Sequence, residues 1–198
     1  HHKLTVNYSQ EKEHQPFEWA NYVITCDARI DNRESLVDEL KLGKDSLSLT
    51  APYLILQAYK RWGKECVKYL DGEFCFVIYD KANELAFGVC DPIGFRTFYY
   101  YEDPQVFIFA SEIKAIEVAK RNCLEVNYNV FINYFSNIKQ PITYDKSIKV
   151  LPAAHSIQTR LHTNTKKSQY WSLNRSGKVK YNNITDWSER IVQTVTKK

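Results

Sequence analysis

The stretch from Phe74 to Tyr79 constrains the fold more than any other part of the chain, because it is apolar at both odd and even positions. Successive side chains of a β-strand point to opposite faces, so neither face of this strand can be left in water. The turn residues 80–84 and a second apolar run, 85–90, follow it, which predicts a β-hairpin built on a strand over 73–79. A strand that is apolar on both faces lies between two covering layers. The sequence therefore predicts a layered sandwich.

The other periodic segments predict a mixture of helices and hairpins. Apolar residues at helical spacing predict helices over 33–40, 52–62, 111–120 and 126–137, and a further helix that begins at Thr185. Apolar and β-branched runs predict a strand over 22–26, ended by an exit turn over 27–32, and hairpins that pair 97–101 with 106–110 and 155–161 with 167–173. This order of elements indicates an α+β fold.

Composition excludes several classes of function. The net charge of the 198 residues is only +4 and the lysines are scattered, so we expect no nucleic-acid partner. The five cysteines are an odd set without a Cys-x-x-Cys pair, which indicates a reducing compartment and argues against a disulfide framework or a metal site. No apolar run is long enough to span a membrane and no signal peptide opens the chain, which predicts a cytoplasmic protein with no membrane partner. Methionine is absent, so the chain is either an excised fragment or one whose modified methionines were dropped from the sequence.

Four motifs follow one another in a recognisable order. The first is Leu-Asp-Gly-Glu-Phe-Cys-Phe-Val-Ile-Tyr-Asp at 70–80, and the second is Cys-Asp-Pro-Ile-Gly-Phe-Arg-Thr-Phe-Tyr-Tyr at 90–100. The third is Phe-Ala-Ser-Glu-Ile-Lys-Ala at 109–115, and the fourth consists of Leu151, Pro152, His155, Tyr170 and Trp171. Together they resemble the class II glutamine amidotransferase domain of the asparagine synthetase family, in which the first two motifs read Leu-x-Gly-x-Phe-Ala-Phe and Arg-Asp-x-x-Gly-x-Lys-Pro-Leu-Tyr-Tyr.

This resemblance implies an N-terminal-nucleophile (Ntn) hydrolase-like fold, a four-layer αββα sandwich of two antiparallel sheets between helices, here lacking its first strands. It divides the chain into a polar N-terminal segment (1–21), an amidotransferase-like domain (22–173) and a linker (174–198) toward an absent synthetase domain. ATP and magnesium are expected only for that absent domain. The partners it implies are the synthetase domain, glutamine or ammonia, and a second copy in a homodimer.

At the positions that form the glutamine site in the family, this chain has different residues. In the family, the nucleophile is a cysteine at the mature N-terminus, whereas position 1 is His here and every cysteine is internal, so we expect no catalytic residue in this chain. Asp27 and Ala28 stand where glutamine-hydrolysing members carry the Asn and Gly of an oxyanion hole, and Ala51 stands where they carry an aspartate that holds the substrate amino group. A carboxylate facing a developing oxyanion opposes catalysis. The three residues therefore indicate the remnant of a glutamine and oxyanion pocket.

The remaining candidates have structural interpretations beside functional ones. Asp91 and Arg96 could form an acid–base pair, but they are better explained as fixing the turn around Gly94. Ser111 and Glu112 are interpreted as a helix start and not as a nucleophile, and Glu112 and Lys114 could instead face a partner domain. The aromatic clusters at 98–101 and 107–109 are interpreted as core. Cys26 is interpreted as structural, because an acidic neighbour raises the pKa of a thiol.

Several functions remain open from the sequence. The first is a glutaminase-like domain, degenerate in glutamine hydrolysis, of an ATP-dependent amide ligase of the asparagine synthetase type. The alternative is a non-catalytic interaction domain of a peptide-modifying cyclase, because the Asp27–Asn32 segment resembles members that form lasso peptides or β-lactams. A working glutaminase with an upstream cysteine and a stand-alone Ntn hydrolase are further possibilities, and each requires a nucleophile not seen here.

Overall fold

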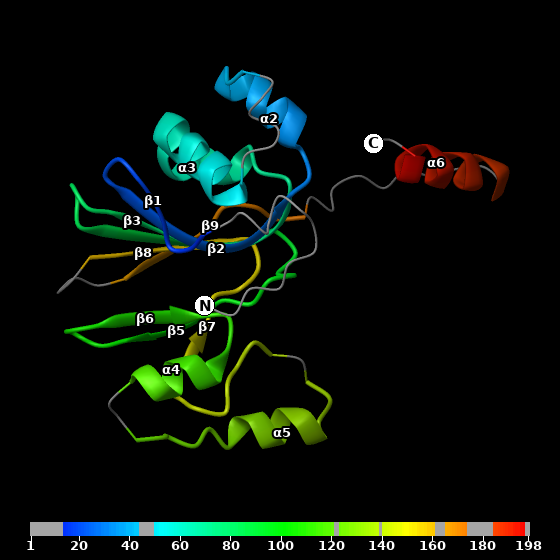
Figure 1. Ribbon diagram of the computed structural model, residues 1–198. Coiled ribbons are helices and arrows are strands. Elements are labelled where there is room, and N and C mark those ends of the chain that lie inside the picture. Colours follow the sequence, from blue (N-terminus) through cyan, green and yellow to red (C-terminus); the bar gives the residue numbers. More distant parts are fainter. Residues whose placement is uncertain are drawn as a thin grey trace.

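The protein is built from two stacked antiparallel sheets with helices outside both (Figure 1). The computed structural model describes residues 14–43, 50–120, 123–138, 140–160, 165–173 and 184–196. The layers follow one another as helices, larger sheet, smaller sheet and helices, so the predicted αββα sandwich is confirmed.

The larger sheet has the strand order β1-β2-β3-β4-β8-β9. Its strands are β1 (Phe17–Trp19), β2 (Tyr22–Ile30), β3 (Gly72–Asp80), β4 (Leu85–Cys90), β8 (His155–Thr159) and β9 (Lys166–Gln169). Helices α2 (Arg33–Leu40) and α3 (Ala51–Trp62) cover its outer face, and the 3₁₀ segment η2 (Gly63–Lys68) leads from α3 back to the sheet. The N-terminus of α3 carries Pro52 in its first turn, where the missing amide hydrogen costs nothing.

The smaller sheet has the order β6-β5-β7, with strands β5 (Tyr99–Glu102), β6 (Phe107–Ala110) and β7 (Lys149–Val150). Helix α4 (Ile113–Ala119) packs on its outer face through Ile116, which is fully buried against Tyr101 and Ile148. Helix α5 (Asn129–Phe135) follows beyond α4, and α6 (Ile184–Thr196) lies near the C-terminal end of the chain (Figure 1).

Strand β3 shows why the layers form. Phe74, Phe76 and Ile78 point toward α3 and join the apolar cluster between the helices and the larger sheet, while Val77 points the other way into the cluster between the sheets. All four side chains are at most 4% exposed. Burying an aliphatic or aromatic side chain of this size stabilises the fold by about 1.5–3 kcal/mol, so the strand contributes to two cores at once, as its sequence predicts.

Gly88 sets how closely the two sheets approach. It lies on the inner face of β4, opposite Val77 and Ile157 in the register. A Cβ atom at this position would lie 2.8 Å from Cζ of Phe98 and 2.7 Å from Cγ2 of Ile157. The missing side chain thus makes room for the Phe98 ring between the sheets.

The structure corrects one strand prediction near the candidate site. The expected exit turn over 27–32 is wrong, because β2 continues to Ile30 and pairs with β3 as far as Gly72. The segment alternates strictly, with Asp27 and Arg29 on the inner side and Ala28 and Ile30 on the helix side. Its charges are tolerated because Arg29 pairs with Glu73 across the sheet and Asp27 pairs with Arg96 of the loop after β4.

Other element boundaries differ by a few residues. Helix α5 covers 129–135 instead of 126–137, and α4 begins at Ile113 after the N-cap residue Glu112, which makes no capping hydrogen bond through its side chain. Ser111 and Glu112, interpreted as a helix start, thus directly precede the first helical residue. Strand β9 ends at Gln169, and the turn before it, 161–164, lies outside the described residues. Residues 174–183 and 197–198 of the proposed 174–198 linker, as well as residues 1–13, also lie outside them.

Among the described residues, no helix is long and apolar enough to cross a membrane.

Candidate functional site

Three charged side chains from separate parts of the chain meet at one end of the sandwich. Asp27 comes from β2, Glu73 from β3, and Arg96 from the loop that follows β4. Nη1 of Arg96 lies 3.2 Å from Oδ2 of Asp27, and its Nη2 lies 3.4 Å from Oε2 of Glu73. Arg96 thus joins the two carboxylates, and its own positive charge is compensated by both.

Arg29 and Asp31 extend this cluster along the surface. Nη2 of Arg29 lies 3.2 Å from Oε1 of Glu73, and its Nε and Nη2 donate to the two oxygens of Asp31 at 2.9 and 3.0 Å. The hydrogen bonding that Arg29 donates to Asp31, with the charges of Asp31 and Glu73, raises the pKa of Arg29 above its ordinary value. Arg29 and Asp31 are about half exposed, so water and salt screen their attraction.

Sequence reasoning missed Glu73 and Arg29 as members of the cluster. The usable signal is the alternation along β2, which places Asp27 and Arg29 on one face once the strand is extended to Ile30. The register then sets Arg29 directly opposite Glu73, and oppositely charged residues that face each other across a sheet attract.

Asp91 holds the loop from which Arg96 extends. Its side chain is buried, with 1% exposure. Its Oδ1 accepts hydrogen bonds from the backbone N–H groups of Ile93, Gly94 and Phe95 at 2.9, 2.6 and 3.1 Å, and its Oδ2 accepts one from the N–H of Arg96 at 3.0 Å. The prediction that Asp91 fixes this turn by binding backbone amides is confirmed.

Gly94 is required in the same loop. Its φ is +75°, a region that side chains rarely adopt, and an added Cβ would lie 3.0 Å from the Cβ of Ala153. The fourth motif closes the loop from the other side: the N–H of Ala154 donates to the carbonyl of Asp91 at 2.8 Å, and the hydroxyl of Tyr170 donates to the carbonyl of Cys90 at 2.6 Å. The motif residues around Gly94 are thus explained by loop geometry.

The cysteines near this end are not activated nucleophiles. Burial, together with the charges of Asp27 and Asp91, raises the pKa of the Cys75 thiol far above its ordinary value. Burial likewise raises the pKa of Cys90 to about 12. Cys26 faces the opposite side of β2, toward α3, where it is buried in the helix-side core. The thiolate is the reactive form of cysteine, so Cys75 and Cys90 are poorly reactive at neutral pH.

The other predicted pocket residues do not gather around Asp27. Ala28 and Ala51 both belong to the helix-side core, whereas the side chain of Asp27 lies on the inner side of the sheet. Ala51 begins α3 and is 6% exposed. The structure therefore separates Asp27 from the two alanines by the thickness of the larger sheet.

Ser111, Glu112 and Lys114 are exposed at the start of α4. The carbonyl of Ser111 accepts a hydrogen bond of 2.8 Å from the hydroxyl of Thr97, the residue that follows Arg96. This bond ties the start of α4 to the Asp91 loop.

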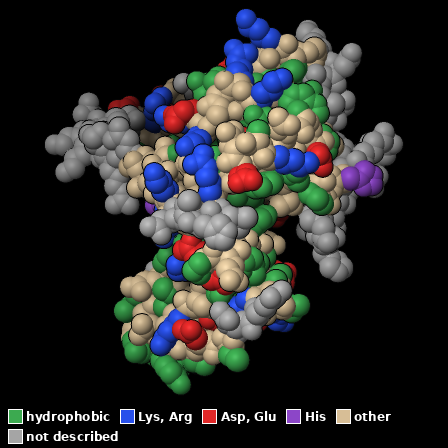
Figure 2. Space-filling view, turned by 90° about the vertical axis from the view of Figure 1, so that its left-hand side faces the viewer, with side chains coloured by type: hydrophobic (Ala, Val, Ile, Leu, Met, Phe, Trp, Pro, Cys, Tyr) green, Lys and Arg blue, Asp and Glu red, His purple; other side chains and the backbone are tan. Residues whose placement is uncertain are grey.

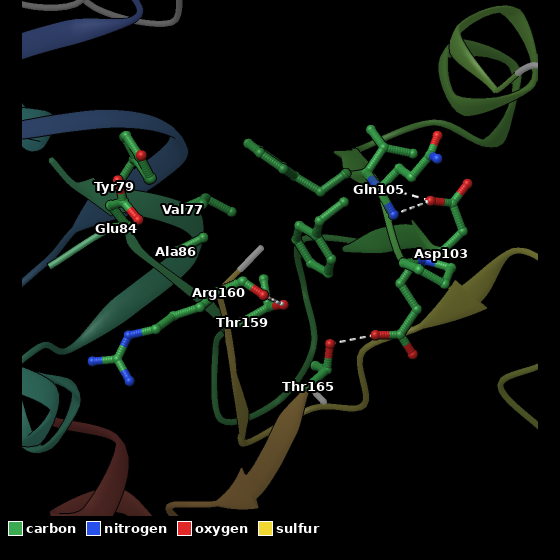
Figure 3. A pocket seen from close by; sticks show the side chains of 14 residues that line it. Val77, Tyr79, Glu84, Ala86, Asp103, Gln105, Thr159, Arg160 and Thr165 are labelled. Atoms are coloured by element: carbon green, nitrogen blue, oxygen red, sulfur yellow. Dashed lines mark hydrogen bonds between the residues drawn. The ribbon is translucent and has the colours of Figure 1, made fainter. Parts of the chain in front are cut away.

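A cavity of about 960 Å³ opens between the sheets toward the other end of β3 (Figure 3). Its walls are largely apolar and include Val77, Ala86, Phe107 and Phe109. Two of its carboxylates are engaged in local contacts: Asp103 accepts the N–H groups of Gln105 and Val106, and Glu102 accepts the hydroxyl of Thr165 (Figure 3). None of the residues expected to form the glutamine pocket lines this cavity.

Metal binding finds no support in the described part of the chain. Within it, no three His, Cys, Asp or Glu side chains lie close enough together to hold a metal ion.

Comparison with known proteins identifies the family. The family model described as "Glutamine amidotransferase domain" matches residues 1–171. The chain belongs to this family. It is 30% identical over 198 aligned residues to a putative glutamine-hydrolysing asparagine synthetase 2 of Methanocaldococcus jannaschii, an alignment that covers 87% of this chain and 37% of that protein. It is 33% identical over 96 residues to the glutamine-hydrolysing asparagine synthetase 3 of Bacillus subtilis, covering 48% of this chain and 16% of that protein.

The domain therefore corresponds to a little more than a third of the length of the Methanocaldococcus relative. Its fold is similar to that of glutamine phosphoribosylpyrophosphate amidotransferase from B. subtilis, with a TM-score of 0.57 at 15% identity over 88% of this chain and 34% of that one. The chain is a glutamine amidotransferase domain of the kind found in asparagine synthetase-like proteins, with an Ntn hydrolase-type fold.

Proposed function

We propose that this domain does not hydrolyse glutamine and that it serves an ATP-dependent amide ligase of the asparagine synthetase type. The observation that carries the proposal is the ion pair between Asp27 and Arg96 at 3.2 Å. Asp27 takes the place of the oxyanion-hole asparagine in the family pattern, and the structure holds its carboxylate beside a guanidinium.

The chemistry of amide hydrolysis explains why this arrangement is unsuitable. Attack on the glutamine side chain places negative charge on its carbonyl oxygen, which must be met by preorganised N–H donors. A carboxylate only accepts hydrogen bonds. Arg96 could in principle stabilise an oxyanion, but Asp27 and Glu73 already compensate its charge.

The proposed parent reaction takes place outside this domain. A ligase of this type activates a carboxylate with ATP, and an amine or ammonia then displaces the activated group to form an amide. The six glycines of the sequence never form a run, and the described residues hold no metal-ligand cluster that would fit ATP and magnesium. Both cofactors are thus assigned to a synthetase domain, which accounts for the greater length of the asparagine synthetase relatives.

Exposed apolar side chains indicate where such a domain would pack. Phe131, Tyr134 and Phe135 of α5 are 53%, 80% and 83% exposed. Figure 2 shows hydrophobic side chains along the left and lower edges of the lower lobe, with a few charged side chains between them. An apolar surface of this kind is typical of an interface, and we assign it to the synthetase domain.

The test compares nitrogen donors in the full-length protein that carries this domain. Amide product is measured with ATP, magnesium and a panel of carboxylate substrates, using either glutamine or an ammonium salt. The proposal predicts product with ammonium or an amine and none with glutamine alone. Equal product with glutamine would contradict it.

A second candidate is a non-catalytic interaction domain of a peptide-modifying cyclase, and the contacts of the Asp27–Asn32 segment favour it. Arg29 binds Asp31 through two hydrogen bonds, and the side chain of Asn32 bonds both the carbonyl of Tyr69 and the N–H of Asp71. These polar residues thus have structural partners. Amide formation within a peptide, without any external nitrogen donor, would support this candidate over the first.

A further inference from the structure

Cys75 and Cys90 face each other directly across two neighbouring strands. They are partners in the register of β3 and β4. The next pair in the ladder is hydrogen-bonded, because the N–H of Asp91 donates to the carbonyl of Phe74 at 2.8 Å. Pairs alternate along an antiparallel ladder, so Cys75 and Cys90 form a non-hydrogen-bonded pair, in which Cα atoms lie about 4.5 Å apart.

This spacing lies within the Cα separation of about 4.4–6.8 Å that disulfides adopt. Both side chains also point the same way, toward the cluster between the two sheets, where Cys90 is 2% exposed and Cys75 packs against it. Both are free thiols, and the S–H of Cys90 donates to the carbonyl of Arg96 at 3.3 Å. Two thiols are thus held in one place by backbone pairing alone.

The pair also borders the charged cluster. Asp27, Cys75 and Cys90 form one row across β2, β3 and β4, because Asp27 is the register partner of Cys75. The backbone carbonyl of Arg96 accepts the hydrogen bond from the S–H of Cys90, so the Arg96 loop contacts this pair directly. A chemical change at this pair would therefore be adjacent to Asp27 and Arg96.

We propose that Cys75 and Cys90 form an oxidation site, a cross-strand dithiol that a peroxide converts reversibly into a disulfide. One thiol reacts with hydrogen peroxide to give a sulfenic acid and water. The second thiol attacks the sulfenic sulfur, forms the S–S bond and releases a second water. The protein loses two hydrogens, the peroxide is reduced, and a dithiol reductant restores both thiols.

Burial determines how this site behaves. It raises the pKa of both thiols, so the reduced pair persists at neutral pH and reacts with peroxide slowly. Once formed, the disulfide joins β3 to β4 covalently and removes the S–H donor to the Arg96 carbonyl. Its formation is thus expected to stiffen the hairpin and to release one contact of the Arg96 loop.

The experiment exposes the folded protein to excess hydrogen peroxide, then denatures it in N-ethylmaleimide and digests it with trypsin without reductant. Cleavage after Lys68, Lys81 and Arg96 puts the two cysteines on separate peptides, 69–81 and 82–96. The expected result is a disulfide-linked pair of these peptides that disappears after dithiothreitol treatment. Recovery of both peptides as maleimide adducts or as sulfinic acids, without the linked species, would overturn the proposal.

Two controls separate this pairing from nonspecific oxidation. Cys123 is exposed and is replaced by serine throughout, which prevents links between molecules. Cys26 is buried on the other face of β2, so a link from Cys75 or Cys90 to Cys26 would equally contradict the proposal. Cys75→Ser and Cys75→Ala should each abolish the linked peptide. The thermal midpoint of each variant, measured before oxidation, must show that at least one of them is folded. In the parent protein, oxidation should raise the midpoint, and dithiothreitol should return it.

Discussion

Replacing Asp91 by alanine tests how strongly its carboxylate organises the loop that carries Arg96. The carboxylate is buried and accepts four backbone N–H groups at 2.6–3.1 Å. Asp91→Ala leaves these donors without an acceptor, and an unsatisfied buried donor costs about 1–3 kcal/mol. Because a relaxed loop would let water reach some of them, we expect a net loss of about 3–5 kcal/mol, a large part of the total of about 5–15 kcal/mol typical of a domain.

Asp91→Asn refines the same test. The asparagine carbonyl can still accept the three bonds made by Oδ1, but its NH₂ group would face the N–H of Arg96. We expect it to cost about 1–3 kcal/mol, less than alanine. Urea unfolding followed by circular dichroism gives the free energy of unfolding of each variant.

The matched control is Asp103→Ala. Asp103 also accepts two backbone N–H groups in a tight turn, from Gln105 and Val106, but it is exposed to solvent. Water can replace these bonds, so the effect should be much smaller than that of Asp91→Ala. Equal losses for the two alanine variants would refute the reasoning, because burial would then not be what makes Asp91 costly to remove.

Three further predictions concern a turn and a buried ion pair. Gly94→Ala should lower the thermal midpoint more than Gly63→Ala does. Both glycines have positive φ, but of the two only Gly94 would place a Cβ within 4 Å of another residue, Ala153. Equal losses would exclude crowding by Ala153. Lys120→Met should lower the free energy of unfolding by about 3–5 kcal/mol in urea, since it leaves the buried Asp145 carboxylate unpaired; a loss under about 1 kcal/mol would contradict this. Burial alone would raise the pKa of Asp145, but hydrogen bonds from Lys120 and Ser147 and the charge of Lys120 hold it below its ordinary value. The pair's contribution should therefore be present above pH about 4, the ordinary pKa of an aspartate, and decline as the pH falls through the lower folded pKa; Lys120→Met should show a flatter decline in melts at pH 2 to 5.

Local patterns predicted the layers and the Asp91 loop well. The two-sided apolar character of Phe74–Tyr79 is sufficient to place β3 between two cores, and those cores are observed. The Asp91 turn was also predictable, because its donors lie within five residues along the chain. Hydrogen bonds between residues so close along the chain can be predicted from a local motif.

The charged cluster was much harder to predict from the sequence. Asp27 and Arg96 are 69 residues apart, and their ion pair depends on how the loop after β4 returns toward β2. Without that partner, Asp27 and Arg29 indicate a turn, which is why the end of β2 was misplaced. The positions of Ala28 and Ala51 on the helix side follow from the extended strand and could not be derived from the motif alone.

The separation of Asp27 from these alanines also changes how the pocket is understood. A family pattern aligns residues one by one, but strand alternation decides which face each side chain occupies. In this domain the inner face carries the acid and its arginine partner. Asp27 and Arg96, and not the alanines, therefore determine whether this face can stabilise an oxyanion.

The most direct test of the central claim is the release of glutamate from glutamine by the full-length protein, with Asp27→Asn measured beside it. We predict no release above the rate of a protein-free blank, because Asp27 places an acceptor where the developing oxyanion needs a donor and, together with Glu73, compensates the charge of Arg96. Steady glutamate release by the unmodified protein would contradict the account, whatever rate the Asp27→Asn variant shows.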